Sequence, residues 1–373
     1  MAATVRTRLT RPVLGRLRLA AQGLAGPGFR TVPDAVRSMP ALQAQDLQAA
    51  LWAVGQRVPG SRAAEVRAAL DRGEIVRSWP MRGTLHLLAP EDLKWVLELT
   101  SGRLIRSLAG RHRELGITTA DVDAAAEAAL RRVAGGNPAS RAELFGAFEQ
   151  AGQPTAGQRG IHLLAMLCQQ RLLVLGPLAG NQQQVVAFDE WIKDSRTLDR
   201  EAGVAEWLLR YLRGHGPATV RDFAWWSGIP LTETRAALAA VRDCLVELEF
   251  EGTQYWLSPE TAGLLDAGLP AQRGVLALPA FDEFLLGYTD RSVVLPAHHA
   301  DRVVPGGNGV FKKTLVAGGA VIGTWSAPGN GRRGSVVPEP FDVVNGLRPA
   351  AQKSFERQAA KYRRFLGLER PGG

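Results

Sequence analysis

The stretch Leu245-Val-Glu-Leu-Glu-Phe-Glu-Gly-Thr-Gln-Tyr-Trp-Leu257 decides the fold, because apolar and polar residues alternate on both sides of a Glu-Gly pair. Alternation with a period of two predicts strands, and the Glu-Gly step predicts the turn of a β-hairpin. Three helices are predicted before it: Glu201 to Arg213, a short helix that Thr219 caps and that ends at Ser227-Gly228, and Glu233 to Val241, capped by Thr232. Three helices and a hairpin make a winged helix-turn-helix.

The same order of elements is predicted twice upstream, with different residues. In the middle copy, Ser140-Arg-Ala-Glu143 is a capping box that opens the second helix. The other elements of that copy are helices over 121–133 and 155–171 and a wing made of 172–176 and 183–188. The first copy consists of a helix that begins at Asp46, a helix over 61–72, and a hairpin within 74–88.

The texture of the sequence changes from Arg273 onward to short β-like runs separated by Gly- and Asn-rich turns, such as Val321 to Trp325 and Ser335 to Pro338. Short strands at this spacing predict a small barrel, and Gln352 to Leu366 predicts a closing helix. The expected fold is mainly α with β: three tandem winged helix-turn-helix domains, then a small β-barrel-like domain and a C-terminal helix. The expected domains are 1–115, 116–195, 196–270 and 271–373.

Composition indicates a soluble globular protein, since 46% of the 373 residues are hydrophobic and 22% are charged. No apolar run approaches the roughly 18 residues of a membrane span. Cys168 and Cys244 each lie in an apolar stretch, so we expect two buried thiols and a reducing cytoplasm. The six histidines show no ligand spacing, so we expect no metal and no cofactor.

Positive charge is concentrated at the N-terminal end. Residues 1–113 hold 18 Lys and Arg against 8 Asp and Glu, which leaves 27 against 28 for the rest of the chain. Such a one-sided charge is what a protein needs to neutralise nucleic-acid phosphates. A merely soluble arginine-rich surface is the alternative.

Two glutamines one residue apart stand in Met39-Pro-Ala-Leu-Gln-Ala-Gln-Asp46. Residues at i and i+2 share a side only in extended backbone, because on a helix they diverge by about 200°. Gln43 and Gln45 therefore point into one place only if the chain is extended ahead of the helix that begins at Asp46. Two polar residues at an ordinary helix entrance are the alternative.

The wing of the first copy is expected over Arg77 to Arg82, with the apolar residues Trp79 and Met81 at its tip. Apolar residues on a charged hairpin can act as wedges between base steps. A tip that packs against a neighbouring domain is an equal alternative.

The chain resembles the AlkZ-like winged-helix DNA glycosylases over roughly residues 15 to 366. The resemblance rests on Leu19-Ala-Ala-Gln-Gly-Leu24, Gln43-Ala-Gln45, Arg82-Gly-Thr-Leu-His-Leu-Leu88, Pro279-Ala-Phe-Asp-Glu283 with Gly287-Tyr-Thr-Asp-Arg291, and Gly323-Thr-Trp325. In that family a Gln-apolar-Gln motif is the catalytic element, so the resemblance implies that Gln43 and Gln45 are catalytic. The branch with Asp in place of the second Gln is not matched, and Ala44 is smaller than the middle residue expected.

The resemblance implies a DNA glycosylase that removes purines alkylated at N7 or N3, including bulky adducts and interstrand crosslinks. Such a base carries positive charge and leaves without protonation, so neutral amides suffice to place a water at C1′. No lysine lies near the pair in the sequence, so we expect a monofunctional hydrolase without Schiff-base chemistry. The expected DNA contacts are Arg77, Trp79, Met81, Arg82, Thr84, His86, Arg291, Asn308, Lys312 and Lys313.

Two alternatives stay open. Asp282, Glu283 and Asp290 could serve acid–base chemistry or form a structural network at a turn. The chain could also be a transcription regulator that only binds DNA, because winged helices are mostly used in that way.

The expected partner is double-stranded DNA carrying alkylated purines, with no membrane. No heptad or obvious dimer helix is present, so we expect a monomer in a bacterial cytoplasm, associated with the nucleoid when bound to DNA. The Arg- and Ala-rich composition is consistent with a producer of DNA-alkylating antibiotics that protects itself.

Overall fold

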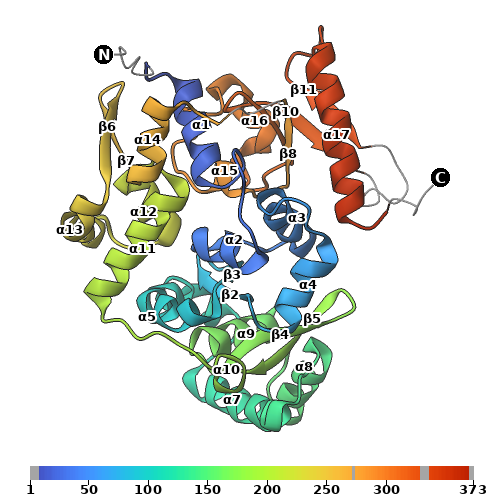
Figure 1. The fold of residues 1–373 in the computed structure, drawn as a ribbon. Helices are drawn as coiled ribbons and strands as arrows, with labels where there is room; N and C mark the ends of the chain where they lie inside the picture. The colour runs from blue at the N-terminus through green and yellow to red at the C-terminus, as the bar shows by residue number, and fades with distance from the viewer. Residues whose placement is uncertain (1–7, 271–273, 328–335, 369–373) are drawn as a thin grey trace. The chain divides into compact units, whose positions relative to one another are not determined.

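The structure, a computed structural model, describes residues 8–270, 274–327 and 336–368, so the expectations at Arg273 and Ser335 lie outside the described residues. The chain is a mixed α/β protein with small antiparallel sheets (Figure 1). It divides into two compact units. Unit 1 comprises Met1–Val66, Ala205–Trp226 and Pro230–Gly373, and unit 2 comprises Arg67–Val204 and Ser227–Ile229.

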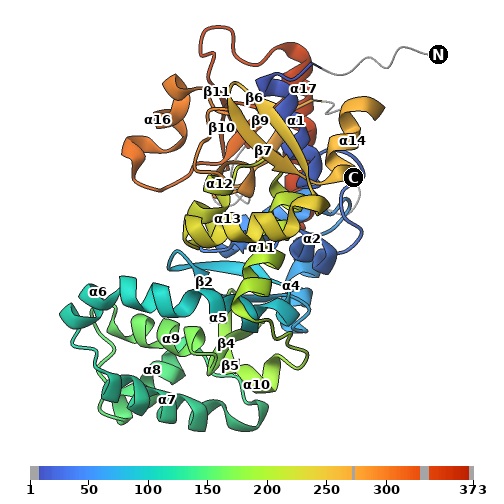
Figure 2. The same cartoon turned by 90° about the vertical axis from the view of Figure 1, so that its left-hand side faces the viewer.

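Unit 2 contains four antiparallel strands in the order β3-β2-β4-β5: β2 (Val76–Met81), β3 (Thr84–Leu88), β4 (Leu173–Ala179) and β5 (Gln182–Ala187). Helices α7, α8 and α9 contact these strands, as Figures 1 and 2 show. The helices of this unit are α5 (Pro90–Ser107), α6 (Ala109–Glu114), α7 (Thr119–Val133), α8 (Arg141–Gln150), α9 (Arg159–Gln169) and α10 (Phe188–Trp191).

Local sequence signals explain several helix starts in unit 2. The Ser140 hydroxyl accepts a hydrogen bond from the Glu143 main-chain N–H, and the Glu143 carboxylate accepts one from the Ser140 N–H, as the sequence predicts. These hydrogen bonds and the nearby Arg132 lower the pKa of the Glu143 carboxyl to about 2. The third helix of this copy begins at Arg159 and not at Thr155.

Unit 1 begins with α1 (Arg11–Ala21), α2 (Val32–Ser38), the two-residue strand β1 (Leu42–Gln43) and α3 (Leu47–Arg57). The residues of α4 (Ala63–Asp71) and of α11 (Arg200–His215) are divided between the two units. The first expected domain, 1–115, contributes to both units, and the four-part division stays a prediction. After α11 and α12 (Val220–Ser227), the chain continues in unit 1 with α13 (Leu231–Val241), β6 (Val246–Phe250), β7 (Thr253–Leu257) and α14 (Pro259–Ala267).

The opening stretch forms the predicted hairpin. Strands β6 and β7 pair antiparallel, and Glu251 and Gly252 take the positive φ angles of 49° and 72° that a tight hairpin turn needs. Helix α13 starts two residues earlier than predicted, at Leu231 after Pro230, so Thr232 is not its cap. The order of α11, α12, α13 and the hairpin is the order that the sequence predicts.

The expected barrel is instead an open sheet in the part of the chain that the structure describes. Its order is β11-β10-β9-β8, with β8 (Leu276–Leu278), β9 (Thr314–Ala317), β10 (Ala320–Ser326) and β11 (Val337–Pro340). The sheet does not close because its outer strands, β8 and β11, pair only with β9 and β10. The short helices α15 (Glu283–Leu286) and α16 (Ala300–Val303) and the final helix α17 (Pro349–Phe365), which contacts β8, complete the unit.

Candidate active site around the glutamine pair

The segment that carries the glutamine pair consists of the short strand β1 followed by a bend. Ala44 is fully buried, while Gln43 is half-buried and Gln45 is exposed. Asp46 keeps extended angles (φ −92°, ψ 108°) and caps α3 by accepting a hydrogen bond from the Ala49 N–H at 3.1 Å. Strand β1 ends at Gln43, and Gln45 and Asp46 lie in a bend. The shared side of the two amides stays a prediction, which the alternating burial of Gln43, Ala44 and Gln45 supports.

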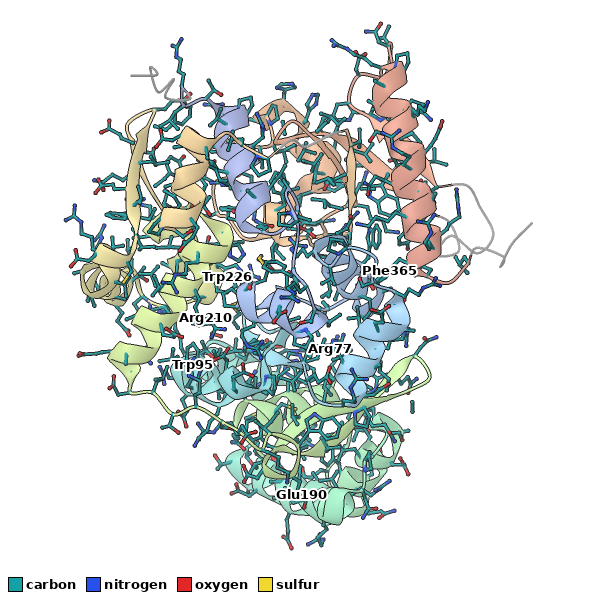
Figure 3. All side chains as sticks on the ribbon, in the orientation of Figure 1. Arg77, Trp95, Glu190, Arg210, Trp226 and Phe365 are labelled. Atoms are coloured by element: carbon teal, nitrogen blue, oxygen red, sulfur yellow. The ribbon has the colours of Figure 1, made fainter. Side chains whose placement is uncertain are left out.

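A buried glutamate holds the first residue of the pair. The main-chain N–H of Gln43 donates to Oε1 of Glu283 at 3.2 Å. Oε2 of Glu283 accepts the indole N–H of Trp226, labelled in Figure 3, at 2.9 Å and faces Nε2 of His215 at 3.2 Å. The Glu283 side chain is 1% exposed. A buried carboxylate is tolerated only when donors satisfy it, and these three donors surround it.

A second buried carboxylate lies beside the first. Asp282 receives both terminal nitrogens of Arg57, the last residue of α3, at 2.8 and 2.9 Å. Arg57 also donates to Oε1 of Gln22 at 2.8 Å and to the carbonyl of Ala53 at 3.0 Å. A two-point Arg–carboxylate pair fixes orientation as well as distance. Asp282 and Glu283 therefore form the structural network at a turn, and this arrangement favours that alternative over the acid–base cluster.

The same network reaches the N-terminal helix through Gln22 and Tyr288. The Gln22 side-chain amide donates to the Tyr288 hydroxyl at 3.1 Å, and that hydroxyl donates to the carbonyl of His215 at 2.6 Å. The Arg18 guanidinium lies 3.7 Å from the centre of the Tyr288 ring. Burial raises the pKa of the Tyr288 hydroxyl, so this group stays neutral and donates. Segments 19–24 and 279–291, which carried the family resemblance, are thus in contact through Gln22 and Tyr288, and the second segment also contacts Gln43 through Glu283.

A small pocket opens beside Asp46, the residue that follows the pair. Lys313 borders this pocket, with its ammonium 5.0 Å from the centre of the Trp325 ring. Burial lowers the pKa of Lys313, and the Asp46 carboxylate opposes that shift. The sequence places Lys313 far from the pair, and only the fold brings it to this pocket. The pocket is lined by Asp46, Gln48, Ala49, Trp52, Pro279, Lys313, Trp325 and Tyr362.

The first hairpin differs from the expected wing. Its turn is Arg82-Gly83, with φ angles of 54° and 68°, so Trp79 and Met81 are not at the tip. All six residues of β2 are buried, because this strand pairs with β3 on one side and β4 on the other. Trp79 belongs to the apolar core of unit 2. This burial favours the packing alternative over the wedge.

The polar residues of this hairpin are also held by neighbours. Arg77 is 9% exposed and donates to Oε1 of Gln183 at 3.3 Å. His86 is buried, with Nδ1 2.9 Å from the carbonyl of Thr84 and Nε2 3.2 Å from a terminal nitrogen of Arg82. Arg82 and Thr84 are half-buried at the turn. Of the six predicted DNA contacts in this hairpin, these two are the most accessible.

The four predicted DNA contacts in unit 1 differ in exposure. Asn308 and Lys312 are exposed, and Asn308 lies in the glycine-rich loop, where its side-chain oxygen accepts from the Val310 N–H at 2.9 Å. Arg291 and Lys313 are half-buried. The Arg291 guanidinium lies between the rings of Trp225 and Phe311, at 5.2 and 4.9 Å.

The cysteines divide, since Cys168 is buried as expected and Cys244 is exposed, contrary to expectation. Cys244 ends the turn after α13, just before β6, so its local apolar neighbours do not enclose it. Burial raises the pKa of the Cys168 thiol.

Among the described residues, no group of three or more His, Cys, Asp or Glu side chains could hold a metal ion. No helix in the described ranges is long and apolar enough to span a membrane.

A family model described as "DNA glycosylase AlkZ-like" matches residues 36–365. The chain therefore belongs to the AlkZ-like DNA glycosylases, and it is an enzyme of that class. The resemblance found in the sequence is confirmed. The alternative of a transcription regulator without catalytic activity is set aside.

Two similar proteins are from Streptomyces sahachiroi. The chain is 27% identical over 345 residues to an interstrand DNA cross-link repair glycosylase of Streptomyces sahachiroi, and the match covers 87% of this chain and 89% of the relative. The solved structure of the DNA glycosylase AlkZ from the same organism matches with a TM-score of 0.81 and 25% identity, over 97% of this chain and 98% of that one. The mixed α/β fold is thus that of a solved glycosylase.

Proposed function

We propose that this glycosylase hydrolyses the N-glycosidic bond of cationic N7- or N3-alkylated purines in double-stranded DNA, with Gln43 and Gln45 as its catalytic residues. The observation that supports the proposal is the burial pattern of the segment, because Ala44 is buried while Gln43 before it is half-buried and Gln45 after it is exposed. The hydrogen bond from the Gln43 N–H to Glu283 holds the segment at its first glutamine.

The chemistry suits neutral amides. A purine alkylated at N7 or N3 carries positive charge, so its bond to the sugar is weakened and the base leaves without a strong acid. Each amide offers one donor group and one acceptor oxygen, which can hold a water against C1′. The transition state resembles an oxocarbenium ion, and the DNA phosphates supply part of the negative potential that stabilises it.

DNA binding is assigned to exposed and half-buried polar groups. The excess of positive charge in residues 1–113 supplies attraction to phosphate. Arg82 and Thr84 at the first hairpin turn, and Asn308 and Lys312 in unit 1, are the proposed contacts. We interpret the three helix-and-hairpin repeats as winged helices that follow the duplex.

Bulky adducts and interstrand crosslinks are the proposed substrates beyond simple methylated bases. Full extrusion of a nucleotide costs a few kcal/mol and is impossible for a base tethered to the opposite strand. The relative that is named as a cross-link repair glycosylase supports this extension. We place the enzyme in a bacterial cytoplasm, as a monomer that protects the cell from a DNA-alkylating product.

The test is incubation of the protein with duplex DNA that carries one N7-alkylguanine. Free alkylated base and an abasic site are expected, without strand cleavage before alkali treatment. Absence of both products at stoichiometric enzyme would refute the function.

A second measurement decides between hydrolysis and Schiff-base chemistry. Borohydride added during the reaction should trap no protein–DNA adduct from a monofunctional hydrolase. An adduct that disappears in Lys313→Arg would overturn the monofunctional assignment, since Lys313 borders the pocket beside Asp46.

A further inference from the structure

We infer that Glu283 is a positioning residue for base excision: its carboxylate fixes the main chain of Gln43 and thereby aims both glutamine side chains. The inference rests on the proposed roles of Gln43 and Gln45. Glu283 is 1% exposed, so it does not itself reach the DNA. Its effect has to pass through the segment that it holds.

The hydrogen bond from Gln43 to Glu283 completes a closed path of main chain and hydrogen bonds that contains the whole glutamine segment. From Gln43 the chain runs through the Asp46 cap into α3, which ends at Arg57. Arg57 binds Asp282, the chain neighbour of Glu283, and Glu283 returns to the Gln43 N–H. The glutamine segment is thus fixed at both ends, by one hydrogen bond to a carboxylate and by a helix that is anchored to the adjacent carboxylate.

The direction of the Glu283 carboxylate is itself determined. The Trp226 indole and the His215 imidazole both approach Oε2, which leaves Oε1 for the Gln43 N–H. Nδ1 of His215 has no hydrogen-bond partner within the described part of the chain, so the ring proton belongs on Nε2, where it donates to Glu283. Oε2 of Glu283 therefore accepts from Trp226 and His215, while Oε1 accepts from Gln43.

A positioning role predicts a loss of rate without a loss of DNA affinity. Reacting groups have to be held to within a fraction of an ångström, and small displacements cost about 10²-fold in rate. We expect Glu283→Ala to slow single-turnover excision of an N7-alkylguanine by about 10- to 100-fold. The dissociation constant for damaged duplex should stay within about threefold of the unmodified enzyme.

A mutant cycle separates positioning from general destabilisation. If Glu283 acts through the glutamines, adding Glu283→Ala to Gln43→Ala/Gln45→Ala should slow excision by less than about twofold further. A further loss of about 10- to 100-fold in excision rate when Glu283→Ala is added to the double alanine variant would overturn the inference. A normal excision rate for Glu283→Ala alone would also overturn it. Glu283→Gln, which keeps an acceptor oxygen for the Gln43 N–H, should retain more activity than Glu283→Ala and serves in its place if the alanine variant does not fold.

The matched control is Asp92→Ala in unit 2. Asp92 is a buried carboxylate that accepts the indole N–H of Trp95 at 3.0 Å, as Glu283 accepts that of Trp226. This variant should lower the melting temperature and leave the excision rate of the folded protein within about threefold. A rate loss equal to that of Glu283→Ala would assign both effects to stability and overturn the inference.

Hydrogen exchange tests the inference without base excision. Peptides covering residues 42–46 should exchange faster in Glu283→Ala or Glu283→Gln than in the unmodified protein, because the Gln43 N–H loses or weakens its bond. Unchanged protection would overturn the positioning role even if the enzyme is active. Faster exchange together with no base release by the unmodified enzyme would instead refute the proposed function and leave the structural contact established.

Discussion

Residues 42–46 and residues 76–81 both combine polar and apolar side chains, yet they occupy different environments. In the glutamine segment, burial alternates, with Ala44 enclosed and Gln45 exposed. In β2, burial is continuous, and Trp79 packs into the core of unit 2. Alternating burial therefore leaves polar side chains accessible on the glutamine segment, whereas apolar residues near a hairpin belong to the core when the strand is paired on both sides.

The largest expected effect on excision falls on the glutamine segment. Gln43→Ala or Gln45→Ala should slow base release by about 10²-fold or more, because a group that positions the water or stabilises developing charge is lost. DNA affinity should be nearly unchanged. Single-turnover rates and binding titrations measure the two quantities, and full excision by the double alanine variant would remove the glutamines from the mechanism.

The next largest effect is expected in the first hairpin, where a substitution should lower the free energy of unfolding. Trp79→Ala should destabilise the protein by about 3–5 kcal/mol, as expected for removing a large aromatic ring from a core. A thermal melt measures the loss, and excision of a small methylated purine and of a bulky adduct should then fall by equal factors in the folded protein. A loss confined to the bulky adduct would restore the wedge interpretation.

A smaller effect is expected at the hairpin turn. Arg82→Ala should weaken binding to damaged and undamaged duplex alike and reduce the slope of binding against salt by about one phosphate contact. Arg77→Ala is the comparison, because that buried side chain bonds Gln183 and should act mainly on stability. Affinity lost for one DNA sequence only would contradict the proposed phosphate contact.

The smallest effect concerns pH and the final helix of the glutamine-bearing unit. Burial lowers the pKa of Lys361 to about 8, and its ammonium donates to Gln56 at 2.9 Å. Because this pKa is depressed on folding, the unfolded chain binds more protons between about pH 8 and 10, and stability rises with pH there by at most about 1 kcal/mol per pH unit. Denaturant titrations at pH 8 and 10 should show this rise in the unmodified protein and a smaller one in Lys361→Met. An equal rise in stability between pH 8 and 10 in both proteins would contradict a lowered pKa of Lys361.

Local signals account for what the sequence predicts correctly. The capping box at Ser140 and the turn at Glu251-Gly252 each depend on residues within a few positions of one another, whereas the shared side of Gln43 and Gln45 stays a prediction. The open sheet does not follow from local signals, since closure depends on whether distant edge strands meet.

Contacts over long sequence separations explain what the sequence misses. Glu283 reaches Gln43 over 240 positions, and Arg57 reaches Asp282 over 225. No spacing rule links such residues, although Asp282 and Glu283 lie in a segment that the resemblance marks. Lys313, which is predicted to contact DNA, is far from the glutamine pair in the sequence and borders the pocket beside Asp46.

The packing of α17 on α3 bears on how the enzyme is made. Trp52 of α3 packs against Tyr362 and Phe365 of α17, with ring centres 5.1 and 5.0 Å apart, and Phe365 is labelled in Figure 3. Helix α3, which begins at Leu47 after its cap Asp46, thus gains this covering only when the ribosome has passed Phe365. Domains fold as units during synthesis, so a nascent chain carries Gln43 and Gln45 for about 320 residues before α17 can cover α3.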